Sequence, residues 1–314
     1  MEMFTQTALK NVLEALLMGQ DYRNEVTGVI TDQFLRYCIE FFKVIVETKI
    51  DDKRITLDWY KEHFINNPDL KKDEIAINSG INMKTIQNQR GSTLKSIVID
   101  ASNENYEDLK NIISELISTE PDLDIKMTIR YNNVSVELTL NETLVVVNSL
   151  AVKRAAIRGG AWSAIGKNIE KPLMLALCKL YSVPSDYVDD SYTKVDYVRD
   201  ETAYSREIDF YLKDEYFNEL LCEVKLMGKG NPESADAVIA RGTDIFVADT
   251  LSETNRRQLD DLDVNWIELR SDIGFRKFKS VLEKCKVPHD TSREPDINDV
   301  LEVINDKTLY SSYY

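Results

Sequence analysis

The chain has 314 residues, of which 43% are hydrophobic and 9% are aromatic. That is enough apolar material for one large domain or for two of ordinary size. No stretch approaches the roughly 18 uncharged apolar residues of a membrane-spanning helix, and the N-terminus lacks the basic start and apolar stretch of a signal peptide. We therefore expect a cytoplasmic protein that has no membrane partner.

The histidines and cysteines argue against several kinds of site. The chain has two histidines, His63 and His289, too few for a histidine-rich zinc site, and their number also argues against a histidine-based triad. The cysteines lie far apart in apolar surroundings, with no CxxC pair among Cys38, Cys178, Cys222 and Cys285. We expect them to be reduced, buried thiols.

The overall charge is acidic. There are 39 basic and 54 acidic residues, which gives a formal net charge of −15. Phosphate binding rewards positive charge, but the field that a ligand meets is local. A nucleic-acid partner therefore requires stretches in which the sign of the charge reverses. Residues 81–96 and 153–171 are two such stretches.

The apolar spacing predicts a mainly helical N-terminal region. Spacings of three and four mark amphipathic helices at residues 34–45, 58–66 and 105–118. Alternating apolar residues on either side of Asn132-Asn133 predict a β-hairpin, because asparagine tolerates the positive φ of a tight turn. A further helix is expected from residue 142 to near residue 157.

Beyond residue 159 helices alternate with strands. We expect a helix at 161–180 with a kink or break at Pro172, strands at 207–212, 220–226, 243–248 and 264–269, and helices at 234–240, 252–259 and 275–284. This alternation predicts an α/β (α+β) fold, with a central mixed sheet flanked by helices. We divide the chain into a helical N-terminal region at 1–140, a core at 141–287, and an acidic polar C-terminal tail at 288–314 with no assigned function.

Residues 73–90 resemble a helix-turn-helix. Ala76 lets two helices cross closely, Gly80 permits a left-handed turn residue, and Asn82 would cap the second helix. That second helix suits the DNA major groove. Its candidate DNA-binding residues are Asn82, Lys84, Thr85, Gln87, Asn88 and Arg90. A plain helical hairpin is the alternative.

Residues 153–171 carry five basic residues and one acidic residue, Glu170. The candidate DNA contacts in this stretch are Arg154, Arg158 and Lys167. Gly159-Gly160 would let the backbone come close to a phosphate, with amide donors from a helix that begins at Ala161. An ordinary solvated basic face is the alternative.

One segment combines two carboxylates with a lysine, namely Asp209 followed by Glu223-Val224-Lys225. Successive side chains of a strand point to opposite faces, so Glu223 and Lys225 share a face. A turn within 214–218 lets an antiparallel strand bring Asp209 beside them. The alternative is a surface hairpin with an incidental ion pair.

These residue types suit phosphodiester hydrolysis, whose pentacovalent phosphorus carries an extra negative charge. Asp209 and Glu223, with the backbone carbonyl of Val224, can bind Mg²⁺, which prefers oxygen ligands. The metal polarises a phosphoryl oxygen and lowers the pKa of a bound water. Lys225 can orient that water and stabilise the developing charge. We therefore expect a Mg²⁺-dependent catalytic site at Asp209, Glu223 and Lys225.

Asp209…Glu223-x-Lys225 resembles the PD-(D/E)xK nuclease signature, although Ile208 stands where proline is common. The element order over 155–285 is similar to that superfamily's core. Residues 152–163 and 222–236 look like type II restriction endonucleases, in particular the CfrBI-type family. The resemblance implies a restriction-endonuclease-like fold and Mg²⁺-dependent cleavage of double-stranded DNA at a short palindromic sequence. It also implies a homodimer and a DNA methyltransferase as genetic neighbour.

The resemblance also makes Glu170 a helix-borne third carboxylate, whereas a salt bridge to Lys167 or Lys171 is the alternative.

The loop that follows the second strand is rich in glycine and proline, and ligands usually meet a sheet at such a loop. After the second strand, candidate DNA contacts are Lys229, Asn231, Glu233, Ser234, Asp236 and Arg241. Arginine can pair with guanine, asparagine with adenine, and an acid can accept from cytosine N4. A loop that caps a helix through Ser234 or Asn231 is the alternative.

Two other functions fit the same residues. One is a DNA-binding regulator with an inactive nuclease-like core, and the intact Asp209, Glu223 and Lys225 set argues against it. The other is a DNA repair or recombination nuclease. Cleavage of one short sequence, or a methyltransferase gene next door, would separate a restriction enzyme from that nuclease.

Overall fold

The computed structural model describes residues 6–50, 56–190, 193–199, 202–208, 210–226, 242–271 and 274–313. Of residues 48–50, 193–199, 202–208 and 311–313 it describes the backbone. Among the described helices, none has both the length and the apolar character that crossing a bilayer requires.

The chain forms two compact units. One comprises Met1–Val29 with Ala161–Tyr314, and the other comprises Ile30–Gly160. Two helices, α2 (Arg23–Ile50) and α7 (Leu140–Leu180), contribute residues to both units. The boundaries predicted at residues 140 and 287 divide the sequence differently and stay predictions.

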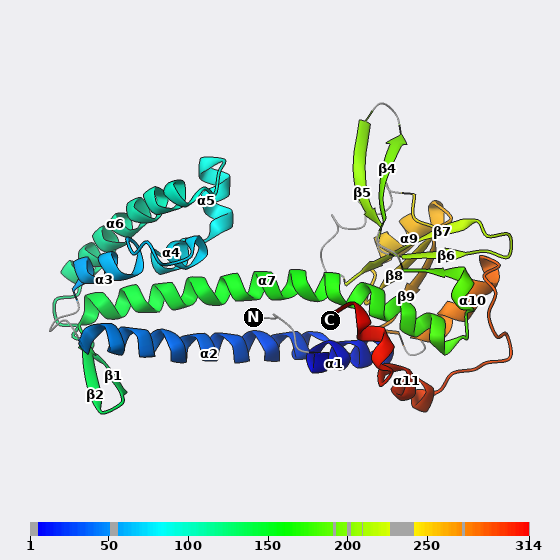
Figure 1. Cartoon of the computed structure of the whole chain (residues 1–314), viewed down its shortest axis with the longest axis horizontal. Helices are drawn as coiled ribbons and strands as arrows, with labels where there is room; N and C mark the ends of the chain where they lie inside the picture. The colour runs from blue at the N-terminus through cyan, green and yellow to red at the C-terminus, as the bar shows by residue number, and fades with distance from the viewer. Residues whose placement is uncertain are drawn as a thin grey trace. The chain divides into compact units, whose positions relative to one another are not determined.

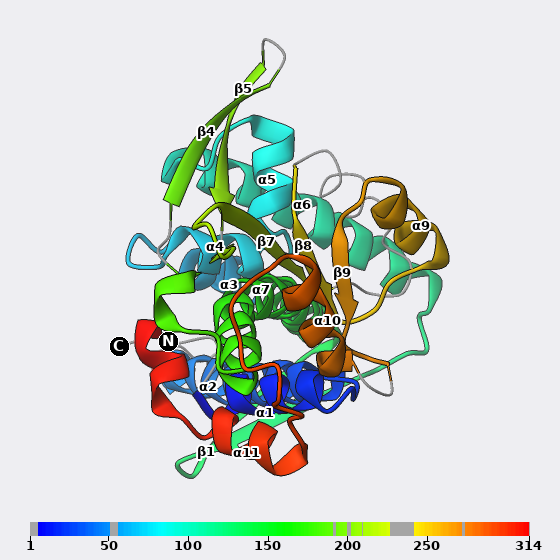
Figure 2. The same cartoon turned by 90° about the vertical axis from the view of Figure 1, so that its right-hand side faces the viewer.

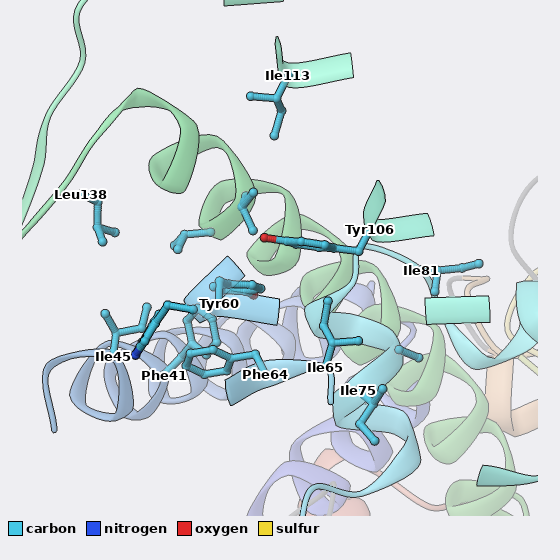
Figure 3. Packing of buried hydrophobic residues seen from close by; sticks show 14 of the residues in the cluster. Phe41, Ile45, Tyr60, Phe64, Ile65, Ile75, Ile81, Tyr106, Ile113 and Leu138 are labelled. Carbon is cyan, nitrogen blue, oxygen red and sulfur yellow. The ribbon is translucent and has the colours of Figure 1, made fainter. Parts of the chain in front are cut away.

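The unit of residues 30–160 is mainly helical, as predicted. Besides α2 and α7 it contains α3 (Leu57–Phe64), α4 (Lys72–Asn78), α5 (Met83–Arg90) and α6 (Lys95–Thr119). The buried rings of Tyr60 and Tyr106 stack at its centre, with 5.9 Å between ring centroids (Figure 3). The Tyr60 hydroxyl lies 3.2 Å from the Asn78 carbonyl oxygen and 3.0 Å from Ser149 Oγ. One buried phenol therefore links α3, α4 and α7.

The predicted hairpin is also present. β1 (Met127–Tyr131) and β2 (Val134–Leu138) are antiparallel. Asn132 and Asn133 both have positive φ, 48° and 64°. Val136 and Leu138 are buried in the core of this unit. The turn residues and the apolar alternation together fix the register, since a slip by one residue would expose both side chains.

The prediction of two helices within 142–180 is wrong, because α7 is one helix of 41 residues. Gly159 and Gly160 lie inside it, and Pro172 does not end it. Glycine costs about 1 kcal/mol relative to alanine in a helix interior. That cost is offset by a continuous buried stripe at four-residue spacing, formed by Ala161, Ile165, Ile169 and Leu173.

A mixed five-stranded sheet lies in the other unit, which confirms the predicted α/β fold. Its order is β3-β6-β7-β8-β9, where β7 is antiparallel to β6 and parallel to β8, and β8 is parallel to β9. The strands of this sheet are β3 (Val188–Asp189), β6 (Phe210–Lys213), β7 (Glu219–Lys225), β8 (Ile245–Ala248) and β9 (Asn265–Glu268). A short 3-10 helix, η1 (Ser185–Tyr187), precedes β3. Figure 2 shows β7, β8 and β9 side by side.

Helices cover both faces of this sheet. Leu259 of α9 (Glu253–Asp261) packs with Phe246, which pairs with Glu223, so α9 covers the Glu223 face. Ser252 caps α9, as predicted. Burial raises the pKa of Cys222 on the opposite face, with Cys178 of α7 and Cys285 close by. Cys285 directly follows α10 (Lys277–Lys284), which η2 (Gly274–Arg276) precedes. All four cysteines are free thiols, as expected, but Cys38 and Cys285 are only half-buried.

Two parts of this unit were not predicted. β4 (Thr193–Arg199) and β5 (Thr202–Ile208) form a separate antiparallel ribbon, so the single strand expected at 207–212 is divided between β5 and β6. The C-terminal segment contains α11 (Ile297–Ile304) and η3 (Lys307–Tyr313). α11 contacts α1 (Gln6–Leu17), and Val300, Ile304, Leu309 and Tyr310 are buried. The helix predicted at 234–240 lies outside the described residues.

A hydrogen bond from Lys179 lowers the pKa of Asp306 to about 2, which ties the C-terminal segment to α7. Because the folded pKa lies below the unfolded value, the pair stabilises the fold at neutral pH. This contribution is lost as the pH falls from about 5 towards 2. Asp306→Asn should therefore lower the melting temperature at pH 7, by an amount that reflects about 1 kcal/mol or less because solvent screens the pair.

Thermal melts of Asp306→Asn and the wild type between pH 7 and pH 3 test this pair. The difference in melting temperature should shrink as the pH falls. A difference that stays constant or grows on acidification would contradict the assigned role of the carboxylate.

Candidate active site

Glu223 is a buried carboxylate in the middle of the sheet. β7 lies between β6 and β8, and Glu223 is only 3% exposed. Taking a carboxylate out of water costs several kcal/mol unless charged or hydrogen-bonding partners replace the water. A purely structural role would favour an apolar side chain at this position.

Lys225 supplies a charged partner for this carboxylate. Its Nζ lies 2.8 Å from Glu223 Oε1, which confirms the prediction that the two side chains share a face. The lysine side chain is 31% exposed, whereas that of Glu223 is 5% exposed. Solvent therefore reaches the lysine side chain more readily than the carboxylate, and an approaching phosphate would meet positive charge.

The third predicted member of the cluster, Asp209, lies outside the described residues. The next residue in the chain, Phe210, begins β6 and pairs with Cys222, the neighbour of Glu223. The hairpin that joins β6 to β7 is present as predicted. Its turn is held by Asp214, whose pKa is lowered by a hydrogen bond from the Asn218 side chain.

Of the two carboxylates predicted to bind Mg²⁺, Asp209 and Glu223, the structure describes Glu223. Glu223 offers the oxygen ligands that Mg²⁺ prefers. Among the described residues no group of three or more histidine, cysteine or acidic side chains could hold a metal ion. Val224 pairs with Val247 in the parallel ladder, and the role of its carbonyl as a ligand stays a prediction.

The helix-borne acid, Glu170, is half-buried on α7. The neighbouring Lys171 pairs with Asp190, with 3.0 Å between Nζ and Oδ2. Lys167 is exposed. A place for Glu170 in the metal site stays a prediction.

Two further buried carboxylates stand at the carboxyl ends of the neighbouring strands. Asp249 directly follows β8, is fully buried, and lies 3.6 Å from Arg23. Glu268 ends β9 and accepts hydrogen bonds from the Leu251 N–H and from Arg256 of α9. We did not predict either residue from the sequence. The available signal was an acidic residue at the end of a buried apolar strand.

Both helices predicted within residues 73–90 are present. Gly80 has φ +87°, Ala76 is buried, and the Asn82 side chain caps α5 by accepting from the Thr85 N–H at 2.9 Å. Ile86 is fully buried. The exposed residues of α5 are Lys84, Gln87, Asn88, Gln89 and Arg90.

Three of the residues predicted to bind DNA through α5 already have partners in the fold. The Asn82 side chain also accepts from the Thr85 hydroxyl, at 3.2 Å, so both side chains belong to the helix cap. Arg90 pairs with Glu104 of α6. Lys84, Gln87 and Asn88 remain the exposed polar face. A role for this face in DNA binding stays a prediction.

Arg154 and Arg158 are exposed on α7, one turn apart, and the Arg154 guanidinium lies 5.4 Å from the centre of the Phe34 ring. The phosphate approach predicted at Gly159-Gly160 is wrong, because both glycines lie inside α7. No helix begins at Ala161, so its amide is not a terminal donor.

The loop and helix predicted after β7 lie outside the described residues, which include nothing from 227–241. The candidate DNA contacts in this segment are Lys229, Asn231, Glu233, Ser234, Asp236 and Arg241.

With this geometry in place, the sequence model of one protein family, described as CfrBI restriction endonuclease, matches residues 6–256. The chain belongs to the CfrBI restriction endonuclease family. No curated protein and no solved structure matches the chain. Membership confirms the resemblance noted from the sequence and the restriction-endonuclease-like fold. The protein is accordingly a nuclease and a hydrolase, and its substrate is double-stranded DNA. The matched residues include both α5 and the pair of Glu223 and Lys225.

Glu223→Gln should reduce DNA cleavage at least about 100-fold, the effect typical of losing one group that stabilises transition-state charge. The variant should keep its DNA affinity in Ca²⁺ and its melting temperature, because a buried charge is removed rather than an apolar contact. Gel cleavage assays, equilibrium binding and thermal melting measure these three properties.

Glu268→Gln is the matched control, since Glu268 is also a buried carboxylate on the same sheet face. Like Glu223→Gln, it should keep its melting temperature, because it removes the same kind of buried charge and Arg256 is 42% exposed, but it should leave cleavage largely intact. If both variants lose cleavage to the same extent, Glu223 has no role in cleavage that Glu268 lacks.

Proposed function

We propose that this protein is a type II restriction endonuclease, which hydrolyses double-stranded DNA at a short palindromic sequence with Mg²⁺. The observation that carries the proposal is the pair of Glu223 and Lys225 at the centre of the sheet, in a chain of a restriction endonuclease family. A DNA-binding regulator gains nothing from a carboxylate buried there, because the buried charge lowers stability.

In this proposal Asp209 and Glu223 hold the metal, with the Val224 carbonyl and Glu170 as further oxygen donors. When bound, Mg²⁺ supplies positive charge to a phosphoryl oxygen and lowers the pKa of a bound water. Glu223 fits this role because it is a hard oxygen donor in a protected position.

Lys225 orients the attacking water and stabilises the charge that develops on the phosphate. Its position supports this role, since the side chain is 31% exposed and its ammonium lies beside Glu223. The same ammonium offsets the charge of Glu223 in the free enzyme, so the carboxylate is held in place before DNA arrives.

α5 is the element that we propose reads DNA, as the second helix of a helix-turn-helix. Lys84, Gln87 and Asn88 are exposed on it, and Ile86 anchors the helix to the core. Arg154, Arg158 and Lys167 are exposed on α7 and would contact phosphates. In this scheme residues 1–140 form the reading part, 141–287 the nuclease core and 288–314 a tail.

The proposal includes a homodimer. Two active sites related by a two-fold axis match the two strands of a palindromic sequence. A cognate DNA methyltransferase gene is expected nearby, because it would protect the host's own copies of that sequence.

Purified protein should cut phage-sized duplex DNA into discrete bands with Mg²⁺, and should bind without cutting when Ca²⁺ replaces Mg²⁺. Gel electrophoresis, with a metal-free sample as control, measures both results. A smear would favour a repair nuclease on the same fold. Intact but retarded DNA under all conditions would favour a DNA-binding protein.

Lys84→Ala should weaken DNA binding, because a cation on the exposed face of α5 is lost. The size of the effect should fall with rising salt, as expected for a phosphate or base contact made by a charged group. Lys126→Ala is the control, since Lys126 is an exposed lysine outside α5, just before β1, and its partner Asp124 lies 4.0 Å away. Fluorescence anisotropy with labelled duplex measures both variants, and equal affinities would contradict the role of α5.

A further inference from the structure

The β4–β5 ribbon is a separate two-stranded sheet beside the candidate active site. Within the described residues β4 and β5 pair with each other and join no other strand. Figures 1 and 2 show the ribbon extending away from the five-stranded sheet. An isolated two-stranded ribbon is marginally stable in water. Its seven-residue strands reach roughly 20 Å, at about 3.3 Å per residue.

The register of the ribbon separates its charged residues onto two faces. Arg206 pairs with Val195, Tyr204 with Tyr197, and Thr202 with Arg199. Because residues alternate between faces, these six positions share one face, which has two arginines, two tyrosines and no acidic residue. The other face holds Lys194 with Glu207, Asp196 with Ser205, and Val198 with Ala203.

We propose that the face with Arg199 and Arg206 is a DNA-contacting surface, and that the ribbon lies along a groove of the bound duplex. The major groove accommodates a two-stranded ribbon. Arginine binds phosphates and guanine, and tyrosine hydroxyls are common donors to phosphate oxygens. The two arginine positions are four residues apart along the ribbon, about 13 Å, which corresponds to roughly four base pairs.

The chain connection places this surface next to the site of cleavage. β5 ends at Ile208, and β6 begins two residues later at Phe210, which pairs with Cys222 beside Glu223. β5 also contacts β7 itself. A duplex whose phosphate reaches Glu223 would therefore pass the base of the ribbon.

This inference rests on the proposed function, because it assumes that the protein binds duplex DNA. The test compares the double variant Arg199→Ala/Arg206→Ala with Lys194→Ala, whose lysine lies on the opposite face. Binding to a labelled 40-base-pair duplex of mixed sequence is measured by anisotropy in Ca²⁺ over a range of salt concentrations. The salt slope of log affinity should fall by about 0.9 for each arginine that contacts a phosphate. Lys194→Ala should leave the slope unchanged.

Amide hydrogen exchange of the wild-type protein provides a second measurement that needs no variant. DNA should slow exchange in residues 193–199 and 202–208. If the wild type cleaves and binds DNA but the arginine variant has an unchanged salt slope, this inference alone is overturned. If the wild type does not bind DNA, the proposed function is overturned. If the double variant has a changed sedimentation coefficient but an unchanged salt slope, the face instead contacts a second copy of the chain.

Discussion

The hydrogen-bonded ladder of β6, β7 and β8 is the constraint on which the candidate active site depends. β7 is antiparallel to β6 and parallel to β8, so its register is fixed on both sides. A shift of one residue would move Glu223 and Lys225 to the face of Cys222 and Val224. The burial of Cys222 and Val224 on that opposite face opposes such a shift. Packing on the far side of the sheet thus positions the charged pair.

The ends of the parallel strands follow one electrostatic pattern. The side chains of Glu223, Asp249 and Glu268 are 5%, 0% and 10% exposed, while their partners Lys225, Arg23 and Arg256 are 31%, 31% and 42% exposed. Each carboxylate lies inside and each cation reaches solvent. Breaking any such pair by removing the cation would leave a buried charge, so the cations are needed for stability.

The acidic composition is compatible with a DNA substrate because charge is distributed unevenly. Many carboxylates are engaged in surface pairs, such as Asp32 with Arg36 and Glu253 with Arg257. α5 has no acidic residue, and Arg154 and Arg158 stand together on α7. A polyanion responds to these local fields, since charges beyond about 10 Å are screened at 0.1 M salt.

Some features follow from local preference in the sequence: the shared face of Glu223 and Lys225, the turn at Asn132-Asn133 and the caps at Asn82 and Ser252. They depend on side-chain period and on dihedral preference over a few residues. Packing between distant segments, in contrast, makes α7 continue through Gly159-Gly160 and places β7 between β6 and β8. It also brought Asp249 to Arg23 and made β4–β5 a ribbon of its own. These features depend on burial and pairing between distant segments, whose free energy no local pattern contains.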